Sequence, residues 1–254
     1  MNTQEQKWHE LLMEAVNKPG LILAAYTAFH NYSLGNQIAA MVQCQRRGLT
    51  VGPLNTYPRW RALGRQVRRG EKALWLCMPL TRKVKDNDGD DDENITTFVW
   101  KNAWFTLSQT EGEPLPALEI PTWDKNRALA ALSISQVAFT HTDGNCQGYA
   151  KGREIAVSPI AALPHKTLFH ELAHVELGHT VEIDFSDAET TPRNLREVEA
   201  ESVAFLLCES LELPGAEFCR GYIQSWLKAD IIPEKSAQKI FGGADRILKA
   251  GREQ

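Results

Sequence analysis

The stretch Thr167-Leu-Phe-His-Glu-Leu-Ala-His-Val175 carries the pattern His-Glu-x-x-His inside an apolar run without proline or glycine. Such a run predicts a helix, and residues four apart share one face of a helix. His170 and His174 can therefore present two imidazoles to one metal ion, and Glu171 can take a proton from a bound water. Two nitrogen ligands, a third ligand from elsewhere and an open position are typical of a catalytic zinc site. The alternative is a surface helix with two solvated histidines.

A second run with helical spacing, residues 196–208, offers the third ligand. Glu197 and Glu201 lie four residues apart and share a face. In many zincins the ligand glutamate precedes, by one turn, an acidic residue that holds the free nitrogen of a ligand histidine. We therefore expect Glu197 to bind the metal and Glu201 to orient a histidine, with Glu199 as the second candidate for the ligand. The other competitor, His179, follows a glycine and is interpreted as the end of the helix.

The composition predicts a globular chain with one large or two modest cores. The chain has 254 residues, of which 43% are hydrophobic, and that length suffices for either arrangement. No apolar run is long enough to span a membrane, and the polar start does not resemble a signal peptide. The five cysteines are scattered without Cys-x-x-Cys pairs, which favours reduced thiols. We therefore expect a cytoplasmic protein that does not enter a membrane.

The charges are distributed unevenly along the chain. Residues 1–120 carry 14 lysines and arginines against 13 acids, and six of those acids lie in one acidic loop, residues 86–94. Residues 121–254 carry 14 basic residues and 19 acids. A basic half and an acidic half predict two modules with different partners, residues 1–120 and 121–254.

The pattern of elements predicts an α+β fold in two domains. The first domain has amphipathic helices, a helix that Ser33 can cap, and a long hairpin whose tip is the acidic loop. One glycine and three prolines between residues 109 and 123 indicate a linker. The second domain is expected to contain strands near residues 137–140 and 153–157, the His-Glu-x-x-His helix and further helices.

The basic segment Tyr57–Lys72 predicts contact with nucleic acid. It has six cations and one acid, together with two aromatic residues. Arginine binds phosphate in a bidentate way, and exposed aromatic rings stack on unpaired bases, which favours a single strand over a duplex. A second run, residues 31–37, places small polar donors at a helix N-terminus, where anions bind. The predicted DNA-binding residues are Asn31, Tyr32, Ser33, Asn36, Tyr57, Arg59, Trp60, Arg61, Arg65, Arg68, Arg69 and Lys72. For Trp60, packing inside the core is an equal alternative.

Taken together, these motifs resemble a known family. The stretches Asn-Tyr-Ser-Leu-Gly-Asn-Gln at 31–37, Thr-Tyr-Pro-Arg-Trp at 56–60, Gly-Arg-Gln-Val-Arg-Arg-Gly-Glu-Lys at 64–72 and Trp-Phe-Thr-Leu-Ser-Gln-Thr at 104–110 are similar to the N-terminal domain of ArdC-type antirestriction proteins. The His170–His174 motif and the helix at 197–204 resemble their C-terminal zincin domain. The likeness covers nearly the whole chain, except for the acidic loop.

The resemblance implies a plasmid-encoded bacterial protein that protects incoming conjugative DNA from host restriction. It implies a single-stranded-DNA-binding domain joined to a metallopeptidase-like domain, with His170, His174 and Glu197 as metal ligands and Glu171 as the catalytic base. One divalent ion is expected, zinc first, with manganese or iron as alternatives. Two functions stay open: a metallopeptidase acting on a restriction enzyme or another DNA-bound protein, or a non-catalytic protein that shields DNA around a structural metal. A DNA-associated metalloprotease with another role is a variant of the first.

Overall fold

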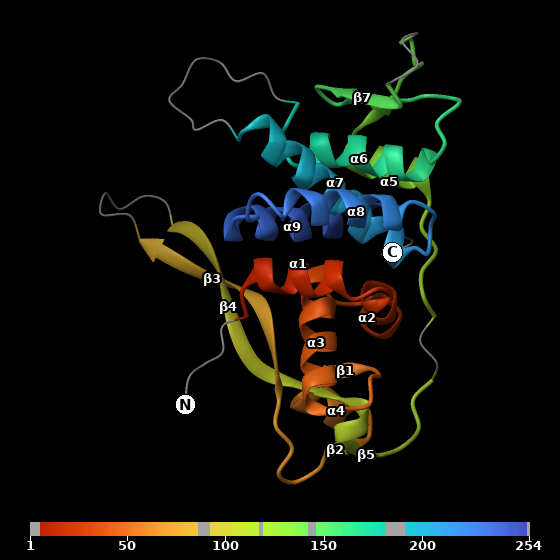
Figure 1. Cartoon of the computed structure of the whole chain (residues 1–254). Helices are drawn as coiled ribbons and strands as arrows, with labels where there is room; N and C mark the ends of the chain where they lie inside the picture. The colour runs from red at the N-terminus through yellow and green to blue at the C-terminus, as the bar shows by residue number, and fades with distance from the viewer. Residues whose placement is uncertain (1–5, 86–91, 117–118, 142–145, 181–190, 253–254) are drawn as a thin grey trace. The chain divides into compact units, whose positions relative to one another are not determined.

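The computed structural model describes residues 6–85, 92–116, 119–141, 146–180 and 191–252 (Figure 1). Helices and sheets are both present, so the predicted α+β class is confirmed. The chain divides into two compact units. The first unit comprises Met1–Gln6 and Ala39–Ala117, and the second comprises Lys7–Ile38 and Leu118–Gln254.

This division differs from the predicted boundary at residue 120 in the placement of residues 7–38. These residues belong to the second unit, because the helices α1 (Trp8–Asn17) and α2 (Leu21–Phe29) bury their apolar faces against other helices of that unit. The backbone N–H of Trp8, for example, donates to the Glu234 carboxylate at 2.7 Å. Sequence patterns showed the helices but not which core they join.

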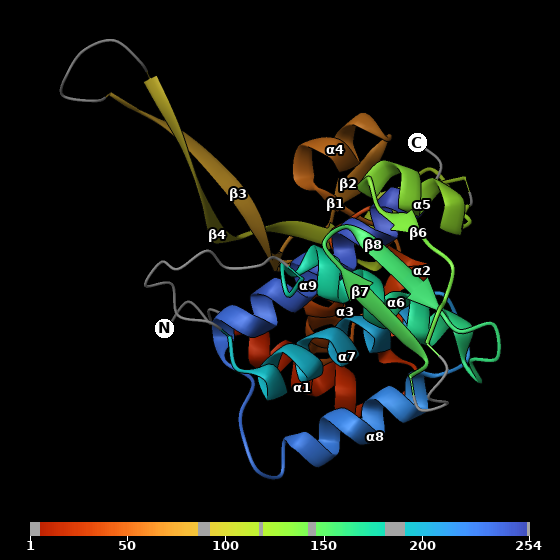
Figure 2. The ribbon, with the colours of Figure 1, turned by 90° about the horizontal axis from the view of Figure 1, so that it is seen from above.

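The first unit contains an antiparallel sheet with strand order β1-β4-β3. Its strands are β1 (Leu54–Thr56), β3 (Leu74–Lys85) and β4 (Asp92–Thr106). The hairpin of β3 and β4 is longer than predicted and projects as a two-stranded ribbon (Figure 2). Its pairing shifts register between Leu74 and Trp75. Residues 86–91 of the predicted acidic loop lie outside the described residues, and residues 92–94 begin β4.

Short elements complete the first unit. They are the C-terminal part of α3 (Leu34–Arg47), α4 (Tyr57–Ala62), β2 (Arg65–Val67), the 3-10 helix η1 (Leu107–Gln109) and β5 (Thr110–Gly112). Pro58 lies in the first turn of α4, where its missing N–H needs no partner. The strands β2 and β5 pair antiparallel. Gly112 has a φ of +131°, and a Cβ there would lie 2.5 Å from the Gly64 carbonyl oxygen, so this turn requires glycine.

The second unit surrounds one buried helix, α7 (Arg193–Ser210). Its other helices are α1, α2, α5 (Lys125–Leu132), α6 (Pro164–Glu176), α8 (Ala216–Trp226) and α9 (Glu234–Gly251). Because α6, α8, α9 and α2 all pack on α7, this helix is buried around most of its circumference. No helix in the described part of the chain is long and apolar enough to cross a membrane.

A small sheet covers α6 (Figure 2). Its strand order is β6-β8-β7, with bounds β6 (Ser135–Gln136), β7 (Gly148–Lys151) and β8 (Glu154–Val157). The central strand β8 pairs parallel with β6 and antiparallel with β7, so β7 is an edge strand directly above α6. The strand expected near residues 137–140 lies earlier, at β6, whereas β8 matches the strand expected at 153–157.

Candidate metal centre

Helix α6 holds its histidines in place by burying the opposite stripe. Leu168, Leu172 and Val175 are at most 5% exposed and pack in the core of the second unit. His170 and His174 lie one turn apart on the other side and are half-buried. The imidazoles therefore project from a rigid element, which is what a metal ligand needs.

Glu197, from α7, joins the two histidines. The Nε2 atoms of His170 and His174 lie 3.1 Å apart. A carboxylate oxygen of Glu197 lies 3.5 Å from the first of these atoms and 3.8 Å from the second. Ligands about 2.1 Å from a tetrahedral zinc ion are about 3.4 Å from one another, so a triangle of this size fits one ion. Among the described residues, no other group of three His, Cys, Asp or Glu side chains meets this criterion.

His170 is oriented by a carboxylate behind it. Its Nδ1 lies 2.9 Å from Glu201, which also receives the Lys166 ammonium at 2.9 Å. Burial alone lowers the pKa of His170, but hydrogen bonds with Glu197 and Glu201 outweigh it and raise that pKa to about 9. Burial raises the pKa of Glu201, but hydrogen bonds from His170 and Lys166 bring it down to about 2. The Nδ1–H proton is thus directed at Glu201, which leaves Nε2 as the metal-facing atom.

His174 is oriented through a second histidine. Its Nδ1 lies 3.0 Å from Nδ1 of His179, whose Nε2 lies 2.8 Å from Glu199. Glu199 is 1% exposed and also receives the Lys239 ammonium at 3.2 Å. With an ionised Glu199, His179 donates from Nε2 and accepts at Nδ1, so His174 donates from Nδ1 and keeps Nε2 free for a metal.

The structure therefore assigns new places to the two competitors for the third ligand. Glu199 is directed at His179 and not at the triangle. Helix α6 ends at Glu176 as the following glycine, Gly178 with a φ of +72°, predicted. The turn that this glycine permits brings His179 back onto His174, a contact that sequence reasoning missed.

Glu171 is placed beside the triangle as a buried carboxyl. It is 7% exposed, and burial raises its pKa against the opposing effect of the two histidines. Gly148 of the edge strand β7 leaves room for it, because a Cβ there would lie 2.9 Å from a Glu171 oxygen and 2.6 Å from Thr167. A groove of ≈ 640 Å³ opens over these residues, with Phe218 of α8 at its border.

The predicted DNA-binding residues fall into three groups. The first group is exposed in the first unit and consists of Tyr57, Arg59, Arg61, Arg69 and Lys72. The second group, Asn31, Tyr32, Ser33 and Asn36, belongs to the second unit.

The third group, Trp60, Arg65 and Arg68, forms hydrogen bonds inside the first unit, and for Trp60 the structure shows the packed alternative. Trp60 is fully buried, and its indole N–H donates to the Phe105 carbonyl at 2.9 Å, so it cannot stack on a base. The Arg65 guanidinium donates to Thr110 and to the carbonyls of Gly112 and Glu113. Arg68 donates to the carbonyls of Ser108 and Thr110. These two arginines therefore tie β2 to β5.

Comparison with known proteins assigns the N-terminal residues to a family and the whole chain to a fold. Residues 3–110 match the N-terminal domain of the anti-restriction factor ArdC. The metal-free structure of the antirestriction protein ArdC from plasmid R388 is 22% identical, covers 96% of this chain and 94% of its own, and has a TM-score of 0.55. Residues 3–110 are an ArdC-type N-terminal domain, and the chain as a whole has the ArdC fold. The predicted resemblance is thus confirmed, by family for the N-terminal residues and by fold for the whole chain.

A second ArdC structure bears on the metal. The Mn(II)-bound form of the same R388 protein is 21% identical, covers 96% of this chain and 97% of its own, and has a TM-score of 0.57. ArdC from R388 therefore binds a divalent ion. No curated protein matches the present chain.

Proposed function

We propose that this ArdC-type chain is an antirestriction protein that combines a metal-dependent peptidase site with a surface for single-stranded DNA. The observation that carries the peptidase part is the triangle of His170, His174 and Glu197 with the buried Glu171 beside it. The antirestriction part is supported by the match of residues 3–110 to the ArdC N-terminal domain. The protected molecule is incoming conjugative DNA.

The donor set suits a divalent ion of borderline character. Two imidazoles and one carboxylate suit zinc, and manganese or iron can use the same ligands. When bound, such an ion supplies a Lewis acid for a peptide carbonyl. His170, His174 and Glu197 hold it, while Glu201 and the His179–Glu199 pair keep both imidazoles in the required tautomer.

Glu171 handles the proton in the proposed hydrolysis. Burial raises the pKa of this carboxyl group, and a carboxylate with a higher pKa is a better proton acceptor. It takes a proton from the water that adds to the carbonyl carbon. As the carbon–nitrogen bond breaks, the same carboxyl returns that proton to the leaving nitrogen. The groove gives a peptide access to this position. We propose a restriction enzyme or another DNA-bound protein as the substrate.

A catalytic role is favoured over a structural one by the number of protein ligands. A structural zinc site usually has four, whereas the described residues offer three here. A structural site also has no use for a buried acid such as Glu171 at its side. The competing function, shielding of DNA by a protein with a structural metal, is supported by the exposed cations of the first unit and is separated by the experiment below.

The DNA surface rests on residues that the structure leaves exposed. Tyr57, Arg59, Arg61, Arg69 and Lys72 are all exposed in the first unit. Their guanidinium and ammonium groups can neutralise phosphates, so binding should weaken as salt rises. Tyr57, with 39% of its surface exposed, can stack on an unpaired base, which favours a single strand.

A restriction-protection assay in cells tests the proposal. Wild type is compared with Glu171→Gln, which keeps the size of the side chain, and with the control Glu154→Gln, an exposed acid on β8. Loss of protection in the first variant alone, with unchanged metal content, supports catalysis. Protection equal to wild type contradicts the peptidase mechanism and favours shielding. A wild-type chain that protects no DNA contradicts the antirestriction function itself.

A further inference from the structure

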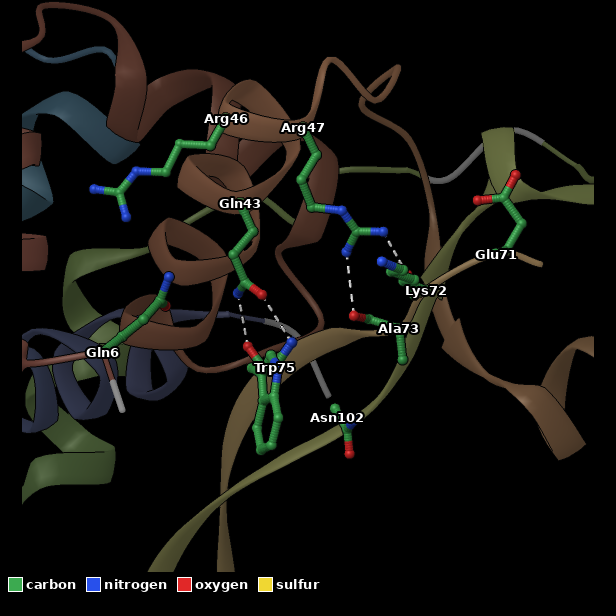
Figure 3. Close-up of a pocket in the computed structure, with 9 residues that line it drawn as sticks. All are labelled: Gln6, Gln43, Arg46, Arg47, Glu71, Lys72, Ala73, Trp75 and Asn102. Carbon is green, nitrogen blue, oxygen red and sulfur yellow. Dashed lines mark hydrogen bonds between the residues drawn. The ribbon is translucent and has the colours of Figure 1, made fainter. Parts of the chain in front are cut away.

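A pocket in the first unit contains residues that the basic segment does not include. Its volume is ≈ 570 Å³, within the range of about 300–1,000 Å³ that is typical of small-ligand sites. It lies between the end of α3, the segment before β3 and the facing part of β4. Its main lining residues are Gln43, Arg46, Arg47, Lys72, Trp75 and Asn102 (Figure 3).

The charge of this pocket is positive. Arg46, Arg47 and Lys72 line it together with one acid, Glu71. That acid is already engaged, because its carboxylate receives Gln109 at 2.9 Å and Arg68 at 3.0 Å. The remaining cations therefore favour an anionic ligand.

Arg47 is held in a fixed orientation. Its guanidinium donates to the carbonyls of Lys72 at 2.5 Å and Ala73 at 3.1 Å. A guanidinium has five N–H donors in one plane, so donors other than these two remain for a ligand. Because the group is already ordered, binding a phosphate costs less side-chain entropy than it would for a free arginine.

Trp75 is anchored by its backbone, which leaves its ring to line the pocket. The buried amide of Gln43 accepts from the Trp75 N–H and donates to its carbonyl, each at 2.8 Å. These bonds occupy the backbone groups of an edge strand at the point where the register shifts. The indole is half-buried, and Figure 3 shows it beside Asn102, on the opposite side of the pocket from Arg46 and Arg47.

We propose that this pocket binds one nucleotide of a single DNA strand. The phosphate lies against Arg46, Arg47 and Lys72, the base stacks on Trp75, and Asn102 is available to the edge of the base. The inference rests on the proposed DNA binding and assigns it a defined subsite. A base in a duplex is stacked on both faces, so only an unpaired base can present a face to the indole.

Binding of a labelled oligo(dT) to the full chain, followed by fluorescence anisotropy, tests the subsite. We expect Trp75→Ala to weaken binding at least about fivefold, and Trp75→Phe to keep most of the affinity, because stacking needs a ring. Arg46→Ala should weaken binding and reduce the salt slope by about 0.7, the value for one phosphate contact on a single strand.

The matched control is Lys101→Ala. Lys101 precedes Asn102 on β4, so its side chain is on the opposite face of the strand, and it is exposed outside the pocket. Equal affinities in Trp75→Ala, Arg46→Ala and this control overturn the subsite but leave DNA binding standing. Competition by inorganic phosphate as strong as by dTMP, or by duplex as strong as by single strand, also overturns it. A wild-type chain that binds no oligo(dT) removes both proposals. If Trp75→Ala does not fold, Trp75→Leu takes its place, because leucine keeps apolar bulk but has no ring to stack on a base.

Discussion

The metal centre of the second unit and the basic segment of the first were both expected from short runs of sequence, yet the structure treats them differently. Around α6 it brings His170, His174, Glu197 and Glu171 into one cluster. In the basic segment it divides similar residues between exposed positions and structural ones, and Trp60 is buried. The spacing of residues on a helix predicts which side chains point in the same direction. The number of cations in a segment does not predict where their side chains point.

The physical cause of this difference is the local backbone. A helix fixes the angle between residues four apart before any tertiary contact forms. Between Tyr57 and Lys72 the chain passes through a six-residue helix, a turn and a short strand, so side-chain direction changes every few residues. Arg65 and Arg68 then find backbone carbonyls of the neighbouring segment, and Arg69 does not.

The largest effect is expected from removing a ligand of the metal. In His170→Ala and in Glu197→Ala the affinity for the divalent ion should fall by more than roughly 10–100-fold. That range is the loss expected when a residue that only supports a ligand is replaced. Elemental analysis and titration with zinc or manganese measure this. Glu199→Ala should keep more of its metal than Glu197→Ala, because Glu199 contacts His179 and not the triangle. The reverse order would move the ligand to Glu199.

Next in size is the effect of the base. Glu171→Gln should retain the ion but cleave an unfolded protein such as casein about 100- to 10,000-fold more slowly, the usual contribution of a positioned proton acceptor. Mass spectrometry of the fragments measures the rate, with Glu154→Gln as the control. Equal rates of cleavage by the two variants would show that Glu171 is not the base. No cleavage by the wild type would show that the two regions are alike in being binding sites only.

A smaller loss of metal affinity is expected when a residue that orients a ligand histidine is replaced. Glu201→Gln removes the charge that faces His170 and Lys166, so metal affinity should fall about 10–100-fold. Glu199→Gln should cost less, because it acts on His174 through His179. Isothermal titration with zinc compares the two. An equal loss would mean that the relay matters as much as the direct carboxylate.

The basic segment should separate into two classes of arginine. Replacing Arg59, Arg61 and Arg69 with Ala should weaken single-strand binding and lower the salt slope by about 2, if each contacts one phosphate. Replacing Arg65 and Arg68 should mainly reduce the free energy of unfolding, by about 0.5–1.5 kcal/mol per lost hydrogen bond. Anisotropy at several salt concentrations and thermal unfolding distinguish these results. The opposite pattern would restore the composition-based prediction.

The smallest effect should be seen at Trp60. Trp60→Phe removes the indole N–H that donates to Phe105, and the free energy of unfolding should fall by about 1 kcal/mol. DNA affinity should stay at the wild-type value, since the ring has no exposed surface. A drop in affinity without a drop in stability contradicts this assignment.

Much of the candidate metal centre was predictable because its distances are local. The helical period places His170 and His174 together, and Glu197 and Glu201 share a face of α7 for the same reason. The relay through His179 was not predictable, because it needs a turn after Gly178 and an ammonium, Lys239, from a helix sixty residues further along the chain. No spacing rule connects these residues.

The fold shows the same division. Local periodicity and turn residues predict the presence of the helices, the β3–β4 hairpin and the strand at β8. The membership of residues 7–38 in the second unit does not, because an amphipathic helix specifies an apolar face but not the core that receives it. The pocket of the first unit was missed for a similar reason. Arg46 and Arg47 lie at the end of α3, and Trp75 and Asn102 meet them only in the folded structure.

Gly148 has a consequence for anyone who scans this protein by substitution. Its φ is ordinary, so any residue suits its backbone, yet a methyl group would collide with Glu171, Thr167 and the Ala156 carbonyl. A deep mutational scan would then score this position as intolerant, much like a catalytic residue, although it contributes no functional group. Selection at such a position maintains the absence of a side chain. Intolerance to substitution therefore also marks residues that only leave space for the active site.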